Sequence, residues 1–161
     1  MNENRLPDVA DIRLENLLPH RAPMILIDRV VAYDVQAKRV DVEVTIGPGQ
    51  VFFDGTGVPA HVAIEYMAQA AAALVGLNDL ASSTEPRPGL LLGTRKLELN
   101  LDHFADGETY RITARCEFED AEAAAFACVI ADAAGKTVAS ATLNAYRPPD
   151  MAAFLKEQTQ S

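Results

Sequence analysis

The segment from Pro59 to about Leu80 constrains the fold of this 161-residue chain more than any other part of the sequence. On a helix, this segment places Ala, Met, Leu, Ile and Val on almost every side. A helix that is apolar all round is a buried helix. Pro59 suits the first helical position, because the N–H that proline lacks would have no partner there. We therefore expect one long buried helix that the rest of the chain encloses.

The segments on either side of this helix have the composition and the period of two that are typical of β-strands. We expect strands at 24–31, 40–46, 97–101, 110–118, 126–131 and 138–146. A short helix that ends at Pro19 comes first, with Leu14, Leu17 and Leu18 on one face. We expect loops at 51–58 and 81–88, and a loose helical tail after residue 149.

This order predicts an α+β fold in which about six antiparallel strands wrap around the long helix. The chain is short enough to form one domain, residues 1–161, with its core at about 14–147. A sheet that curls around a single helix leaves an edge strand exposed, and pairing two such edges is a common remedy. We therefore expect a homodimer.

Composition excludes several classes of function. Hydrophobic residues make up 49% of the chain, which excludes disorder for most of it. A net charge of −9 disfavours nucleic acid and anionic membranes as partners. The longest apolar stretch, Met67–Leu77, is too short to span a membrane, and the polar N-terminus does not resemble a signal peptide. Cys116 and Cys128 form no CxxC pair, so we expect reduced thiols in a cytoplasmic protein.

Glu65 is the residue that most needs an explanation, because it lies near the start of the buried helix. Burying a carboxylate costs several kcal/mol unless it is paired or protonated. A carboxyl group that burial keeps protonated can act as a general acid. The structural alternative is that a neighbouring backbone group or an arginine satisfies Glu65, or that it lies on a wet strip of the helix.

Three further residues are candidates for the same site. His61 and Gln69 lie four residues before and after Glu65, so all three side chains project from one helical face. His61 could share a proton with Glu65 or be a histidine at a helix start near solvent. Gln69 either orients the site or contacts a helix across the dimer. His20 lies between Pro19 and Pro23 and could line a site, although its sequence context alone favours a structural role. His103, the third histidine, is expected to be exposed, and three scattered histidines make a metal site improbable.

Two motifs resemble those of a known family. Residues 17–30, Leu-Leu-Pro-His-Arg-Ala-Pro-Met-Ile-Leu-Ile-Asp-Arg-Val, are similar to the LPHRxPxLLVDRV opening of FabZ-type 3-hydroxyacyl-[acyl-carrier-protein] dehydratases. Residues 64–70, Ile-Glu-Tyr-Met-Ala-Gln-Ala, are similar to their central-helix motif LEAMAQA. The likeness covers about residues 14–147. It implies the hotdog fold, with two subunits paired edge to edge and an acyl chain on phosphopantetheine bound at their interface.

The resemblance also implies roles for residues. In that family a histidine on the loop before the helix removes the α-proton, and a Glu or Asp on the partner's helix protonates the leaving hydroxyl group. The acid carries over onto Glu65. The family's loop, GHFPGxPxMPG, has no matching histidine in residues 53–60 of this chain. This departure resembles the ApeP-like branch, predicted dehydratases associated with aryl polyene synthesis.

The leading hypothesis is therefore a 3-hydroxyacyl-thioester dehydratase with Glu65 as the acid and His61 or His20 as the base. We expect Val58, Ala60 and Gln69 to bind substrate, and the free N–H groups of the helix start at Ala60-His61 to hold the thioester oxygen. An acyl carrier protein is the expected partner, and no metal or organic cofactor is required. One alternative is a half-site or non-catalytic subunit that pairs with a paralogue. The other alternative is an acyl thioesterase.

Overall fold

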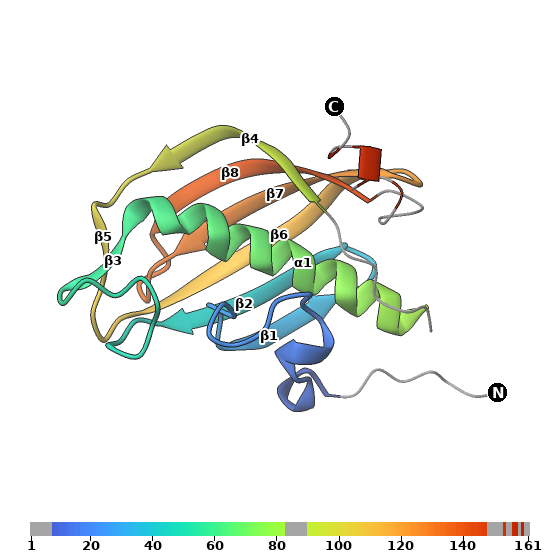
Figure 1. Cartoon of the computed structure of the whole chain (residues 1–161). Coiled ribbons are helices and arrows are strands. Elements are labelled where there is room, and N and C mark those ends of the chain that lie inside the picture. The colour runs from blue at the N-terminus through green and yellow to red at the C-terminus, as the bar shows by residue number, and fades with distance from the viewer. Residues whose placement is uncertain (1–7, 83–89, 148–152, 154–155, 158, 160–161) are drawn as a thin grey trace.

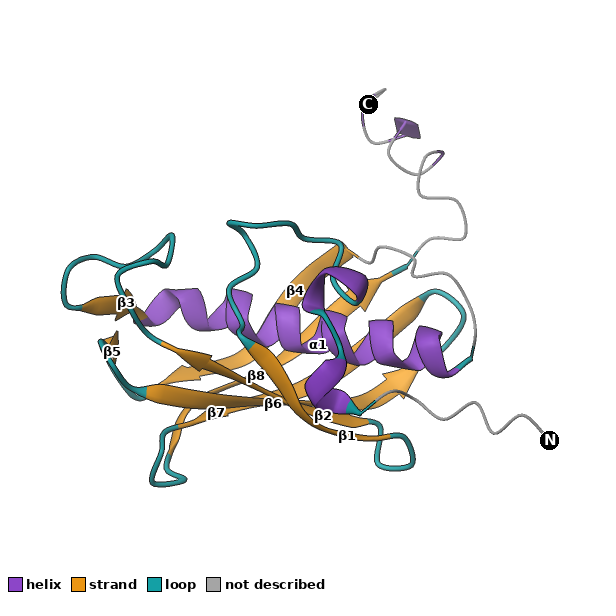
Figure 2. Ribbon diagram, turned by 90° about the horizontal axis from the view of Figure 1, so that it is seen from below, coloured by secondary structure: helices purple, strands orange, loops and turns teal. Residues whose placement is uncertain are grey.

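The computed structural model describes residues 8–82, 90–147, 153, 156–157 and 159. One long helix, α1 (Ala63–Ala81), lies across one face of a six-stranded antiparallel sheet (Figures 1 and 2). This arrangement confirms the expected α+β hotdog fold. In spatial order the strands are β1 (Arg29–Asp34), β2 (Arg39–Thr45), β6 (Thr109–Glu119), β7 (Ala123–Ala131), β8 (Thr137–Tyr146) and β4 (Leu90–Leu99).

The helix is enclosed as its composition predicts, since every residue of α1 is buried or half-buried. Tyr66, Met67, Leu74 and Leu77 recur at helical spacing and face the sheet, where α1 packs against β2, β6, β7 and β8. The segment Ala60–Ala81 is long and apolar enough to span a membrane by length and composition. Its packing against the sheet accounts for that apolar character.

The N-terminal segment differs from the prediction in its local structure. The expected single helix is two short 3-10 helices, Val9–Asp11 and Leu14–Asn16, although the predicted leucines are buried. The strand expected at 24–31 begins only at Arg29. The reason is that the Gln69 side chain, rather than a neighbouring strand, bonds the backbone groups of Met24 and Leu26.

The start of the long helix also differs from the prediction. Part of the expected loop is a short strand, β3 (Gly57–Pro59), which pairs with β5 (His103–Ala105). A Cβ atom at Gly57 would lie 2.1 Å from the carbonyl oxygen of Phe104, so this close pairing requires glycine. Pro59 precedes a 3-10 turn (Ala60–Val62), and α1 follows that turn. The loop expected at 81–88 begins later than predicted, since Ala81 is the last residue of α1. Residues 83–88 of this loop and most of the expected C-terminal tail lie outside the described residues.

The sheet has two edge strands, β1 and β4 (Figure 1). On β4, Leu97 and Leu99 are 39% and 37% exposed. Cys116 and Cys128 are both free thiols, as expected from their spacing. Burial raises the pKa of the Cys128 thiol to about 12, so this group stays protonated at neutral pH.

Candidate active site

Glu65 lies in the first turn of α1, on the helix face that points away from the sheet. Its side chain is 37% exposed, so it is less enclosed than the sequence led us to expect. The physical reason is its angular position, because the neighbouring Tyr66 and Met67 take the sheet-facing positions. The carboxyl group nevertheless borders a cavity of about 980 Å³.

His20 lines the same cavity and faces the same carboxyl group. Its Nε2 atom lies 3.4 Å from Oε1 of Glu65, and 29% of its side chain is exposed. Its other ring nitrogen, Nδ1, is buried and has no hydrogen-bond partner in the described part of the chain. The structure therefore brings together one histidine and one carboxyl group from segments 45 positions apart in the sequence.

Gln69 fixes the geometry of this pair. The side chain is fully buried, and its Oε1 accepts a hydrogen bond of 2.8 Å from the N–H of Leu26. Its Nε2 donates to the carbonyl oxygen of Met24 at 2.7 Å and to Oε1 of Glu65 at 3.2 Å. These bonds tie the segment after His20 to the helix. Of the two alternatives for Gln69, the structure supports an orienting role within its own chain.

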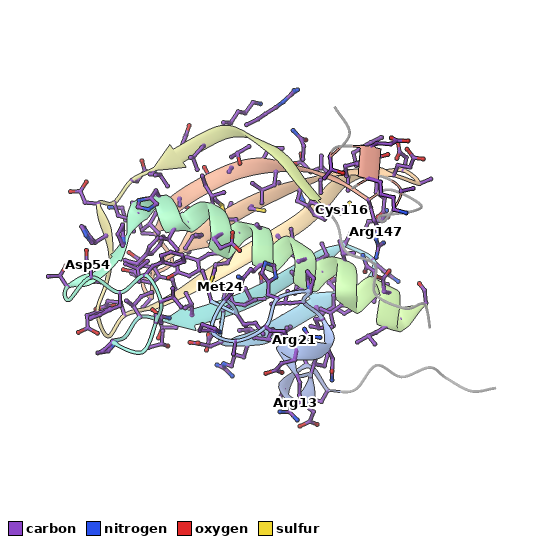
Figure 3. The ribbon with its side chains drawn as sticks, in the orientation of Figure 1. Arg13, Arg21, Met24, Asp54, Cys116 and Arg147 are labelled. Carbon is purple, nitrogen blue, oxygen red and sulfur yellow. The ribbon has the colours of Figure 1, made fainter. Side chains whose placement is uncertain are left out.

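Arg21 holds the loop that carries His20. Its Nη1 atom donates to the carbonyl oxygens of Glu15 at 3.3 Å, Leu18 at 3.2 Å and His20 at 2.7 Å. Figure 3 shows Arg21 and Met24 on the N-terminal segment beside α1. The guanidinium group thus bonds three backbone carbonyl oxygens and restrains the backbone of His20.

The cavity runs along one side of α1 and also takes Phe126, Leu143 and Ala145 of the sheet as lining. Small and apolar side chains of the helix, Ala68, Ala72 and Val75, form one wall. Leu17 and Leu18 of the N-terminal segment form part of another. Toward the C-terminal end of α1 the lining becomes polar, with three paired groups: Tyr33 and Asn78, Lys38 and Glu119, and Asp79 and Arg147.

Three residues predicted for the site lie elsewhere. His61 is exposed in the 3-10 turn, and the described contacts of Glu65 are with His20 and Gln69 rather than with His61. Val58 is fully buried on β3. The N–H of Ala60 donates to the carbonyl oxygen of Asp102 at 3.0 Å, so it is not free to hold a thioester oxygen. For Ala60 that expectation was wrong, because the chain forms the β3–β5 pair and a 3-10 turn before the α-helix begins.

One further pair of side chains was not predicted from the sequence. Nε2 of His103 lies 2.8 Å from Oδ2 of Asp54, which joins the loop before β3 to β5. The backbone N–H of Thr56 and then His103 hold the pKa of the Asp54 carboxyl well below its usual range. The partners are separated by 49 positions, so no local pattern signals their contact. His103 is exposed as predicted.

The ApeP-like family, described as ApeP dehydratase, matches residues 12–156 of this chain. Curated relatives include the 3-hydroxyacyl-[acyl-carrier-protein] dehydratase FabZ of Chlamydia pneumoniae, which is 35% identical over 96 residues, 56% of this chain and 62% of the relative. The FabZ of Chlamydia trachomatis serovar L2 is 33% identical over 101 residues, 60% of this chain and 64% of the relative. The matches thus span just under two thirds of these two relatives.

Solved structures share the fold. A chain of the dehydratase heterocomplex ApeI:P from Xenorhabdus doucetiae superimposes with a TM-score of 0.82 at 26% identity, over 90% of this chain and 96% of that one. The E. coli PaaI protein from the phenylacetic acid degradation operon gives a TM-score of 0.57 at 16% identity, over 75% and 82% of the two chains. At that identity the second match supports the fold alone.

Proposed function

We propose, since this chain belongs to the ApeP-like dehydratase family, that it removes water from a 3-hydroxyacyl thioester to give a trans-2-enoyl thioester. The observation that carries the proposal is the contact of 3.4 Å between His20 and Glu65 beside a cavity. The relatives named FabZ support an acyl chain on a carrier protein as the substrate. The phosphopantetheine arm would then belong to the substrate.

The pair supplies both proton transfers of the elimination. Neutral His20 takes the α-proton through Nε2, the C–H and C–O bonds break, and the C=C bond forms. The protonated carboxyl group of Glu65 gives its proton to the departing hydroxyl group, which leaves as water. His20 then carries the extra proton and Glu65 is ionised. The ionised carboxylate 3.4 Å away stabilises charged His20, which then releases its proton to solvent while Oε2 of Glu65 takes one up, and this restores the starting state.

The hydrogen bond from Gln69 makes the two carboxyl oxygens of Glu65 chemically different. Both Gln69 and His20 approach Oε1. An amide N–H is a donor only, so it requires Oε1 to accept. The proton for the leaving group is then carried on Oε2, the oxygen that these two side chains do not face. In this proposal the acyl chain extends along the small side chains of α1, where the cavity offers apolar surface.

Comparing His20→Asn with His61→Asn tests which histidine is the base. We expect His20→Asn to lower kcat about 10²–10⁴-fold, the usual contribution of general acid–base catalysis. His61→Asn should keep wild-type kcat, because that side chain lies outside the cavity lining. Turnover is followed through the absorbance of the enoyl thioester, and release of free thiol is measured in parallel. Loss of activity in His61→Asn alone would refute the assignment, and thiol release without enoyl product would indicate a thioesterase.

A half-site role is the second candidate function, and specific observations favour it. The segment before the helix lacks the histidine of the FabZ loop, and a match at a TM-score of 0.82 is part of a dehydratase heterocomplex. Edge strand β4 exposes Leu97 and Leu99, which suits pairing with a second hotdog chain. Nδ1 of His20 is buried without a partner among the described residues, so a second chain could supply one.

Assaying the purified chain alone and with an ApeI-type paralogue separates the two candidates. If the homodimer is the enzyme, the chain alone should convert 3-hydroxyacyl thioester, and the paralogue should add no more than its own activity. If this chain is a half-site, turnover should appear only in the mixture and should depend on Glu65. Leu97→Lys on edge strand β4 should weaken either assembly, measured by light scattering, while the matched Lys136→Glu in the exposed β7–β8 turn should not.

A further inference from the structure

One row of side chains on α1 connects the candidate acid to a charged pair. Glu65, Ala68, Ala72, Val75 and Asp79 follow one another at spacings of three and four, so they share a face of the helix. All five line the cavity. The first and the last lie 14 positions apart, which corresponds to about 21 Å along the helix axis.

The row ends at an ion pair between Asp79 of α1 and Arg147, which follows β8. The two side chains are only 12% and 21% exposed. His20, Asp79 and Arg147 all line the cavity, so it reaches from the loop of His20 to this pair. The nearby polar pairs Tyr33–Asn78 and Lys38–Glu119 line the same end.

An apolar chain cannot pass this point at low cost. Pushing a methylene group between two largely buried, oppositely charged groups would separate the two charges from each other in a site with little water. The small side chains before the pair offer no such obstacle, because contact between alkyl groups and Ala or Val is favourable. Along this row of α1, the cavity wall therefore changes from favourable to unfavourable for an alkyl chain at the ion pair.

We propose that the Asp79–Arg147 ion pair is the end stop of the acyl site and determines the longest acyl chain that the protein accommodates. This inference rests on the proposed function only in taking an acyl thioester as the ligand. The acyl chain contacts the row from Ala68 to Val75, and the ion pair stops it from extending further. Asp79 and Arg147 are thus specificity-determining residues and take no part in the proton transfers.

Binding can be measured without turnover by titrating the full-length protein with acyl-pantetheine amides, from butanoyl to eicosanoyl, in a calorimeter. Below the stop, each added methylene should tighten binding by up to about fourfold, the transfer free energy of one CH₂ group. Beyond the stop, longer chains should gain no affinity. A dissociation constant that keeps falling through the whole series, or no binding of any chain, would overturn the proposal.

The break is the chain length beyond which added methylene groups no longer tighten binding. Two variants should move it in opposite directions. Ala72→Leu narrows the row and should shift the break to shorter chains. The double variant Asp79→Leu/Arg147→Met removes both charges and should shift it to longer chains. The matched control, Arg115→Met/Glu117→Leu, removes an exposed ion pair on β6 that does not line the cavity, and should leave the break unchanged. A break that neither variant moves would refute the end stop.

The same titration with Glu65→Gln distinguishes this proposal from the proposed function. The variant should keep the break in the binding series even though it loses turnover. If Glu65→Gln turns over normally while the break moves as expected in the other variants, the catalytic assignment fails and the end stop stands. If Glu65→Gln loses turnover but neither cavity variant moves the break, the catalytic assignment stands and the end stop fails.

Discussion

Replacing Glu65 with Gln should lower the dehydration rate about 10²–10⁴-fold without unfolding the protein. Glutamine has nearly the same shape and keeps a hydrogen-bonding group beside His20 and Gln69, but it cannot give a proton to the leaving hydroxyl group. The rate of enoyl formation from a 3-hydroxyacyl thioester measures the effect. Thermal unfolding should be nearly unchanged, because the side chain is 37% exposed and forms no part of the core.

Glu15→Gln is the matched control for this variant. Glu15 borders the same cavity, but its carboxylate is half-exposed and lies 3.9 Å from Arg13. This change removes one negative charge beside the cavity and leaves the His20–Glu65 pair intact. The dehydration rate should therefore stay near that of the wild type. Equal losses of dehydration rate in both variants would mean that the rate depends on the negative charge beside the cavity and not on the proton of Glu65. A fully active Glu65→Gln would refute the dehydratase chemistry proposed for this chain.

The main elements could be predicted because their signals are local. The apolar residues of the long helix and the alternation in strands such as β2 and β6 reflect burial on one side or on all sides. These patterns depend on neighbours within a few positions. The strand before Arg29 was predicted wrongly because a β-branched run has the composition of a strand, yet its backbone bonds go to Gln69. A side chain 43 positions away from Leu26 decides that structure.

The candidate site could be predicted only in part, for the same reason. Glu65 stands out because a carboxyl group is unusual in an apolar helix. Its contact with His20 depends on how the N-terminal segment folds back onto α1, which a helical-spacing argument cannot show. That argument selected His61 instead, and the structure places His61 in a turn that precedes the regular helix. Helical periodicity applies only to residues that have helical geometry.

Gly76 explains how the loop of His20 comes so close to the helix, and Gly76→Ala is expected to have the second large effect. A Cβ atom at this position would lie 2.6 Å from the carbonyl oxygen of Leu17 and 3.0 Å from its Cα atom. Alanine is favoured over glycine inside a helix by about 1 kcal/mol. A clash with backbone atoms costs about 1–3 kcal/mol and cannot be relieved by a side-chain rotation. We therefore expect a net loss of up to about 2 kcal/mol in the free energy of unfolding, measured by urea denaturation.

Gly47→Ala separates this clash from the general effect of the substitution. A Cβ atom at Gly47 would meet no described atom within 4 Å, so its stability should change by less than about 1 kcal/mol. In Gly76→Ala the helix must push Leu17 outward, and His20 follows three residues later on the same loop. The rate of dehydration should therefore fall at temperatures where the variant is still fully folded. Unchanged catalysis in a destabilised Gly76→Ala variant would mean that the His20 loop keeps its place without this contact, and that Arg21 and Gln69 suffice to hold it.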